Sequence, residues 1–205
     1  MGIDAALRLK KILGPKGDVR IDANMGWTVD QAIEKMKAFK EIGITSFEQP
    51  VPVDDLEGQT RLVKETNLDV MADESLNNKT SLDLLIREKA CTALNIRVSK
   101  CGGLIAARNR CRQGRNAGLK LQVGCQVGES SVLSSANIYL IRSEERIQYA
   151  EGCYGLNLLE EDPASPVLQF GYAGKPPKLP EGFGLGVFVD EKILRKYARK
   201  SLVVE

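Results

Sequence analysis

The sequence contains no histidine among its 205 residues. This absence excludes histidine-ligated zinc, the Ser-His-Asp and Cys-His arrangements of hydrolases, and acid-base catalysis by imidazole. The five cysteines are an odd number and include no C-x-x-C pair, which argues against a zinc ribbon and a disulfide framework. Any catalysis must therefore use carboxylates, lysine, arginine, tyrosine or a hard metal ion.

The chain also lacks a long apolar run and an excess of either charge. No stretch approaches the roughly 18 consecutive apolar residues of a membrane span, and the start MGIDAALRLKK has no apolar signal region. The 29 basic and 27 acidic residues are spread along the chain, so there is no footprint for nucleic acid or an anionic membrane. We expect a soluble, cytoplasmic protein whose partner is a small molecule.

Strand-like and helix-like segments alternate along the chain. Residues 28–42 begin with a Thr28/Gln31 capping box, carry apolar residues at helical spacing and stop at Gly43, which predicts an amphipathic helix. The same patterns predict six strands and five intervening helices, preceded by a helix over 3–13. The first predicted strand ends at Asp22, and the other five are residues 44–48, 68–73, 93–100, 119–124 and 147–152. The other predicted helices are residues 55–66, 81–89, 103–118 and 130–143.

Three of the predicted strands end in an acid. Asp22, Glu48 and Asp73 follow one another at intervals of 26 and 25 residues. One such acid would more often be a helix N-cap or a solvated loop residue, but three in register indicate a repeated unit with one charged group each. Strands alternating with helices imply a parallel α/β sheet, and a unit near 25 residues suits a barrel or a doubly wound sheet.

Chemical groups at strand ends favour the barrel, whose active sites lie at the carboxyl ends of its strands. Adjacent parallel strand ends are about 5 Å apart, so Asp22, Glu48 and Asp73 would converge on one point. Three anionic oxygens repel one another unless a cation neutralises them. The oxygen-only ligand set suits Mg²⁺ or Mn²⁺, with positions left for substrate and water.

Six ordered segments, RIDANMGW, FEQPV, ADES, SKCGGL, VGES and GFGLGVFVDE, together resemble the enolase superfamily in its muconate-lactonising and mandelate-racemase-like branch. The resemblance implies an incomplete (β/α) TIM-type barrel with Asp22, Glu48 and Asp73 as metal ligands. It also implies an isomerase or lyase that removes a proton next to a carboxylate and stabilises the enolate with Mg²⁺. The substrate would be a small carboxylate.

Two departures from the family affect the bases. The family's first two strands, with a K-x-K lysine pair, and its capping domain would precede residue 1, so we expect a fragment or a chain whose open barrel edges are covered by another copy. The family's second lysine is replaced by Arg97 in the predicted strand 93–100. Arginine is a poor base, so Arg97 would clamp a carboxylate, while Lys100 would lie on the opposite face of that strand.

Three further residues are candidates for the site. Glu129 of VGES matches a family acid near the substrate, with an N-cap of the following helix as the alternative. Glu151 stands where an aspartate often ends the eighth strand, and Glu151 and Asn24 are candidate substrate contacts. The Tyr149-x-Glu151 sequence replaces the D-x-D pair of dipeptide epimerases, which makes dipeptide specificity doubtful.

The alternation stops near residue 160. We expect residues 1–160 to form the partial barrel, strands 3 to 8 of the family, and residues 161–205 to form an irregular tail with a last strand and helix in VFVDEKILRKYARK. Two functions other than an active enzyme remain: an inactive remnant that keeps the metal triad without the lysine bases, and a generic α/β binding module. The module would leave the three strand-end acids unexplained.

Overall fold

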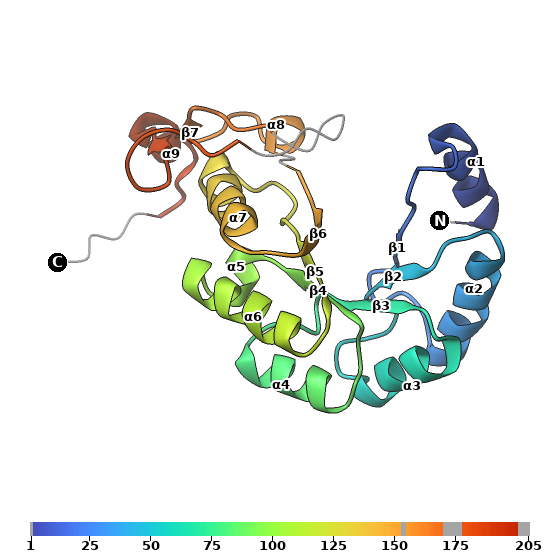
Figure 1. The fold of residues 1–205 in the computed structure, drawn as a ribbon. Helices are drawn as coiled ribbons and strands as arrows, with labels where there is room; N and C mark the ends of the chain where they lie inside the picture. The colour runs from blue at the N-terminus through green and yellow to red at the C-terminus, as the bar shows by residue number, and fades with distance from the viewer. Residues whose placement is uncertain (1, 153–154, 170–177, 201–205) are drawn as a thin grey trace. The chain divides into compact units, whose positions relative to one another are not determined.

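The computed structural model describes residues 2–152, 155–169 and 178–200 (Figure 1). These residues divide into two compact units. Unit 1 comprises Met1–Ile96 with Arg110–Leu121, and unit 2 comprises Arg97–Asn109 with Gln122–Glu205. Within the described ranges, no helix is long and apolar enough to cross a membrane.

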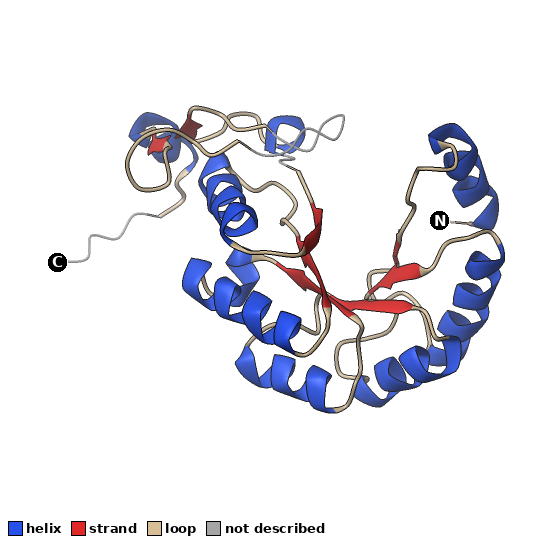
Figure 2. Cartoon of the chain, in the orientation of Figure 1, coloured by secondary structure: helices blue, strands red, loops and turns tan. Residues whose placement is uncertain are grey.

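Helices and strands alternate through unit 1, as expected (Figure 2). The helices are α1 (Ile3–Leu13), α2 (Val29–Glu41), α3 (Leu56–Thr66), α4 (Lys79–Arg87) and the later part of α6 (Leu104–Asn116). The strands are β1 (Ile21–Asp22), β2 (Ser46–Glu48), β3 (Asp69–Ala72), β4 (Ala93–Ile96) and the beginning of β5 (Lys120–Val123). The pairs from β1 to β4 are parallel, which confirms the predicted parallel sheet.

The core of unit 1 lies between the strands and the apolar face of the helices. Phe47 of β2 is fully buried, and its ring lies 6.0 Å from that of Phe39 on α2 and 6.4 Å from that of Trp27. Helix α2 begins with the predicted capping box, in which Thr28 and Gln31 bond reciprocally, and Gly43 after it has the left-handed φ of 76° that favours glycine. Local capping and an apolar stripe therefore place α2 against β2.

Unit 2 holds the shorter and less regular elements. They are α5 (Val98–Cys101), the first part of α6, the end of β5, α7 (Ser131–Ser143), β6 (Ile147–Ala150), α8 (Gly155–Leu158), β7 (Ala164–Ser165), β8 (Phe188–Val189) and α9 (Glu191–Tyr197). Strands β7 and β8 form an antiparallel pair. Of the elements described after residue 152, the sequence predicted β8 and α9 but not α8 and β7. The strands β1 to β6 form one sheet in chain order.

The prediction of a strand over 93–100 is wrong beyond Ile96. Strand β4 ends there, and Val98–Cys101 form a single helical turn, α5, in which Cys101 N donates to Arg97 O over 2.9 Å. Gly102 ends this turn with a φ of 86°, which glycine adopts at little cost. Alternation along a strand therefore says nothing about the direction of Lys100, and the expected opposition of positions 97 and 100 does not hold.

Candidate functional site

Three acids stand at the carboxyl ends of neighbouring strands in unit 1. Asp22 and Glu48 are the last residues of β1 and β2 and are paired in register, and Asp73 directly follows Ala72, the last residue of β3. Gln49 N donates to Met71 O over 2.9 Å, which extends the β2–β3 ladder to the point where Asp73 leaves it. The parallel register thus brings the backbones of all three acids to one edge of the sheet.

The three carboxylates differ in exposure. Glu48 is 7% exposed and Asp73 is 1% exposed, whereas Asp22 is open to solvent. The Asp22 Oδ1 atom accepts a hydrogen bond from Asn24 N over 3.0 Å, and Asn24 has a positive φ of 45°. Asp22 and Asn24 therefore shape the same exposed turn after β1.

Asn95 is a buried partner of Glu48 that the sequence patterns did not single out. Its Nδ2 donates to Glu48 Oε1 over 2.6 Å, and the residue is fully buried on β4. Among the described residues, the Oδ1 atom of Asn95 is buried without a hydrogen-bond donor. A buried polar oxygen left over next to a carboxylate is a group that a cation, or water bound to one, would satisfy.

The donor atoms fit a magnesium ion, although the side chains do not close around one. The set consists of carboxylate and amide oxygens, the ligands that Mg²⁺ prefers. In the described part of the chain, no three Asp, Glu or Cys side chains lie close enough together to hold a metal as they stand. Binding would therefore require these side chains to turn toward a common point, and the metal-ligand roles stay predictions.

A second polar group lies in unit 2 and joins Arg97 to Glu129. Arg97 Nη1 donates to Gln126 Oε1 over 3.1 Å, and Gln126 N donates to Glu129 Oε1 over 2.7 Å. The other oxygen of Glu129 accepts from Asn137 Nδ2 over 3.0 Å. The N-cap of α7 is Ser130, so the alternative interpretation of Glu129 as that N-cap is wrong.

Burial is the largest influence on the pKa of Glu129. The residue is 6% exposed, and loss of water raises the pKa of its carboxyl above the ordinary range, although hydrogen bonds and the charge of Arg97 oppose this shift. A carboxyl with a raised pKa can exchange a proton nearer to neutral pH than an exposed glutamate can.

Glu151 lies just past β6 and contacts the end of β5. Its Oε2 accepts from Cys125 N over 2.9 Å, and its Oε1 accepts from Gln122 Nε2 over 3.2 Å. Burial, with the charges of Glu151 and Glu129, raises the pKa of the Cys125 thiol to about 12. Cys125 is therefore protonated at neutral pH and is no nucleophile.

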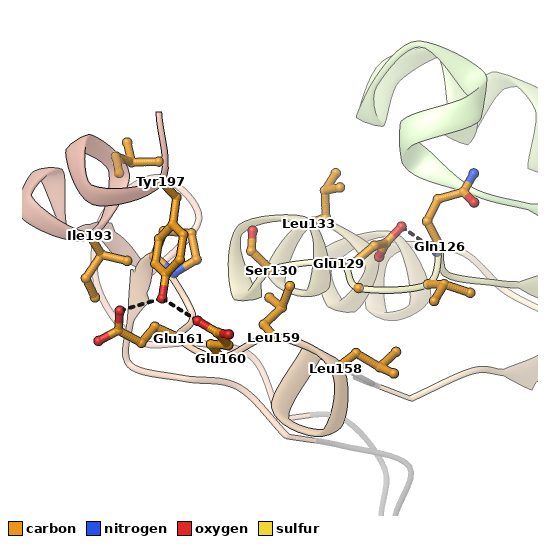
Figure 3. A pocket seen from close by; sticks show the side chains of 14 residues that line it. Gln126, Glu129, Ser130, Leu133, Leu158, Leu159, Glu160, Glu161, Ile193 and Tyr197 are labelled. Atoms are coloured by element: carbon orange, nitrogen blue, oxygen red, sulfur yellow. Dashed lines mark hydrogen bonds between the residues drawn. The ribbon is translucent and has the colours of Figure 1, made fainter. Parts of the chain in front are cut away.

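A cavity of 670 Å³ opens beside Glu129 (Figure 3). Leu133 of α7 and Leu158 of α8 give it an apolar wall, and Tyr197 of α9 lies opposite them (Figure 3). The Tyr197 hydroxyl donates to Glu160 and Glu161 over 3.1 and 2.9 Å. The lining of the cavity therefore combines apolar side chains with the carboxylates of Glu129, Glu160 and Glu161, all within unit 2.

Comparison with known proteins identifies the family. Residues 3–193 match the family described as "Enolase C-terminal domain-like". Muconate cycloisomerase 1 of Acinetobacter baylyi is 28% identical over 96% of this chain and 52% of its own length. The N-succinyl-L-Arg/Lys racemase of Bacillus cereus is 30% identical over 87% of this chain and 47% of its own.

Solved structures agree with this result. The muconate lactonizing enzyme from Pseudomonas putida has a TM-score of 0.86 and 27% identity, covering 96% of this chain and 54% of that one. This confirms the predicted α/β fold class, parallel strands of an incomplete TIM-type barrel. The chain spans about half the length of the relatives it matches. It belongs to the Enolase C-terminal domain-like family of the enolase superfamily, in the branch of the muconate-lactonising enzymes and racemases.

Proposed function

We propose that this chain is the metal-binding part of a Mg²⁺-dependent isomerase or lyase that removes a proton next to the carboxylate of a small substrate. The observation that carries the proposal is the in-register pairing of Asp22 with Glu48, followed by Asp73 at the end of the next strand. The names of the two relatives support it, because a muconate cycloisomerase and an N-succinyl-L-Arg/Lys racemase are isomerases of carboxylates.

Asp22, Glu48 and Asp73 would hold the metal, with Mg²⁺ as the first choice and Mn²⁺ as the second, because every donor is oxygen. The bound cation would supply positive charge for a substrate carboxylate. Burial of Glu48 and Asp73 strengthens this attraction, since an ion pair gains more away from water. Asn95 holds one oxygen of Glu48 and so limits the directions in which that carboxylate can turn.

The residues of unit 2 would contribute to substrate binding and proton transfer. Arg97 carries a permanent charge and a planar donor group, which suits a carboxylate clamp. Glu129 would take or give a proton, Lys100 is the other candidate base, and Glu151 would contact substrate. Asn24, in the turn after Asp22, is the remaining candidate contact.

The position of Arg97 favours a second candidate function, an inactive remnant that retains the metal triad. Arg97 stands where the resemblance places a lysine base, and its guanidinium donates to Gln126. The guanidinium of arginine keeps its positive charge at physiological pH, so it cannot accept the substrate proton. In that case, the chain would bind a metal and a carboxylate without exchanging the proton.

Calorimetric titration with Mg²⁺ tests the metal site. We expect the wild-type chain to bind Mg²⁺ and Asp73→Asn to bind at least about tenfold more weakly, because one anionic ligand is lost. Asp69→Asn is the matched control, since Asp69 begins the same strand, β3, and pairs with Lys120 away from the strand end. Equal binding by the wild type and Asp73→Asn would exclude the triad.

A further inference from the structure

Gln49 has an unusual backbone for its position. It directly follows β2, it is 1% exposed, and its φ is +35°. A positive φ is uncommon for a residue other than glycine and persists only where the surroundings hold it. Pro50 follows it in the sequence. The hydrogen bonds of its side-chain amide explain why this backbone conformation is maintained.

The side chain of Gln49 makes four hydrogen bonds with the loop after β3 and with its own loop. Its Oε1 accepts from Asp73 N over 3.0 Å and from Ser75 N over 3.1 Å. Its Nε2 donates to Ser75 Oγ over 2.8 Å and to Val51 O over 3.0 Å. Both donor hydrogens and both acceptor sites of the amide are therefore used.

The backbone of Gln49 also bonds to the turn that follows β1. Its carbonyl oxygen accepts from Met25 N over 2.7 Å in the turn after Asp22, and its own N–H donates to Met71 of β3. Gln49 is thus bonded to the segments that carry Asp22 and Asp73, and it is covalently joined to Glu48. No other residue type offers two donors and two acceptors on a side chain of this length.

We propose that Gln49 is a positioning residue that sets the spacing between Glu48 and Asp73 in the metal site, an inference that rests on the proposed function above. The side-chain amide of Gln49 fixes the backbone of Asp73 relative to the end of β2 and would not itself contact the cation. Loss of the amide would keep both carboxylates in the chain, but the distance between Glu48 and Asp73 would no longer be fixed. Residues that orient metal ligands in this way typically change affinity by about 10- to 100-fold when they are mutated.

Gln59 provides a control for a purely structural role. It is also 1% exposed, and its Nε2 donates to the same Ser75 Oγ over 2.7 Å from helix α3. Among the described residues, the Gln59 side chain bonds to Ser75, whereas Asp73 N donates to Gln49. Gln49→Met and Gln59→Met remove the same chemical group from the same buried cluster, so a general loss of packing would affect both.

The first measurement is amide hydrogen exchange of the full chain without metal. We expect the amides of Asp73 and Ser75 to exchange at least about tenfold faster in Gln49→Met than in Gln59→Met, because only the first loses their acceptor. Equal exchange at these amides would overturn the positioning role. Should Gln49→Met not fold, Ser75→Ala replaces it, because it removes an acceptor of the Gln49 amide and little volume. Ser75→Ala also removes the acceptor of Gln59, so the effect of Ser75→Ala on the Asp73 amide must exceed that of Gln59→Met.

The second measurement is calorimetric Mg²⁺ titration of the same variants beside the wild type and Asp73→Asn. We expect Gln49→Met to lower the Mg²⁺ affinity by about tenfold or more, Ser75→Ala to lower it severalfold, and Gln59→Met to stay within about twofold of the wild type. Faster exchange in Gln49→Met with unchanged Mg²⁺ affinity would overturn the link to the metal. Absence of binding by the wild type would instead overturn the proposed function, and the inference with it.

Discussion

At the scale of single residues, Glu129 shows how burial competes with hydrogen bonding. Three donors reach its carboxylate: Gln126 N, Asn137 Nδ2 and, at 3.4 Å, Ser99 Oγ. Each favours the charged form, as does the charge of Arg97, yet removal from water is the largest effect and raises the pKa. The carboxyl is therefore tuned by its surroundings in unit 2 and not by its neighbours in sequence alone.

This raised pKa predicts a pH dependence of stability. The folded chain binds the proton of Glu129 more tightly than the unfolded chain does, so the protonated carboxyl contributes to the free energy of unfolding. This contribution is complete below the pKa of the unfolded chain, about 4.3, and is lost as pH rises through the higher pKa of the folded chain. Because glutamine cannot ionise, the Glu129→Gln variant does not lose stability through this residue as pH rises. We expect the free energy of unfolding of Glu129→Gln, relative to the wild type, to increase with pH across that window.

Urea unfolding at a series of pH values measures this difference. Substitution also disturbs the hydrogen bonds of Glu129, which adds an offset, so the slope with pH is the informative quantity. Glu161→Gln is the control, because Lys196 and Tyr197 hold the pKa of Glu161 below its ordinary range and the slope should have the opposite sign. A relative stability of Glu129→Gln that falls with rising pH would contradict the assignment.

At the scale of elements, helices α2 and α7 begin in different ways. Thr28 accepts from Gln31 N and Gln31 accepts from Thr28 N, which satisfies two amide groups of the first turn of α2. Ser130 is the N-cap of α7, but its side chain makes no capping bond. The start of α7 is instead held by Asp162, whose Oδ2 accepts from Ser131 N and Ser131 Oγ over 2.8 and 2.6 Å.

This difference predicts the effect of two equivalent substitutions. Thr28→Ala should lower the free energy of unfolding by about 1 kcal/mol, because it removes a working cap. Ser130→Ala should change it by less than about 0.5 kcal/mol. The single tryptophan, Trp27, precedes Thr28 and reports unfolding of this region by fluorescence during urea titration. Equal losses in the two variants would contradict the predicted difference between the two N-caps.

At the scale of the whole molecule, the two kinds of polar group lie in different units. The strand-end acids and their buried partners belong to unit 1, whereas Arg97, Lys100, Glu129 and Glu151 belong to unit 2. The chain also spans about half the length of its relatives. The expectation that another copy or a further segment covers the sheet edges at β1 and β6 stays a prediction.

This division predicts that the chain alone does not exchange the α-proton of a carboxylate substrate, even with Mg²⁺ present. Exchange requires a base that removes the α-proton, and Arg97, which stands where the resemblance places a lysine base, cannot act as one at neutral pH. Incubation of N-acyl amino acids and dipeptides in D₂O, followed by NMR, measures the exchange. Exchange that disappears in Lys100→Ala would contradict the prediction and make Lys100 the base. Exchange that survives this substitution would also contradict it and would direct attention to Glu129.

Much of the local structure follows from the sequence by itself. The capping box, the apolar stripe and the stop at Gly43 determine α2, because each involves interactions between residues only a few positions apart. The same reasoning correctly predicted the six strands and the ends of three of them at or next to Asp22, Glu48 and Asp73. The strand-end position of these acids was therefore determined by the sequence, and their role as metal ligands stays a prediction.

Other features were decided only by the tertiary structure. Val98 favours a strand by its side chain, yet residues 98–101 form a helical turn in the folded chain. The bonds from Gln49 to Asp73 and from Asn95 to Glu48 join residues 24 and 47 positions apart. Such partners depend on how parallel strands align, and alignment is set by packing of the whole sheet against its helices. A local sequence pattern predicts whether a residue lies in a helix or a strand, but the hydrogen-bond partner of a buried side-chain amide depends on the folded sheet.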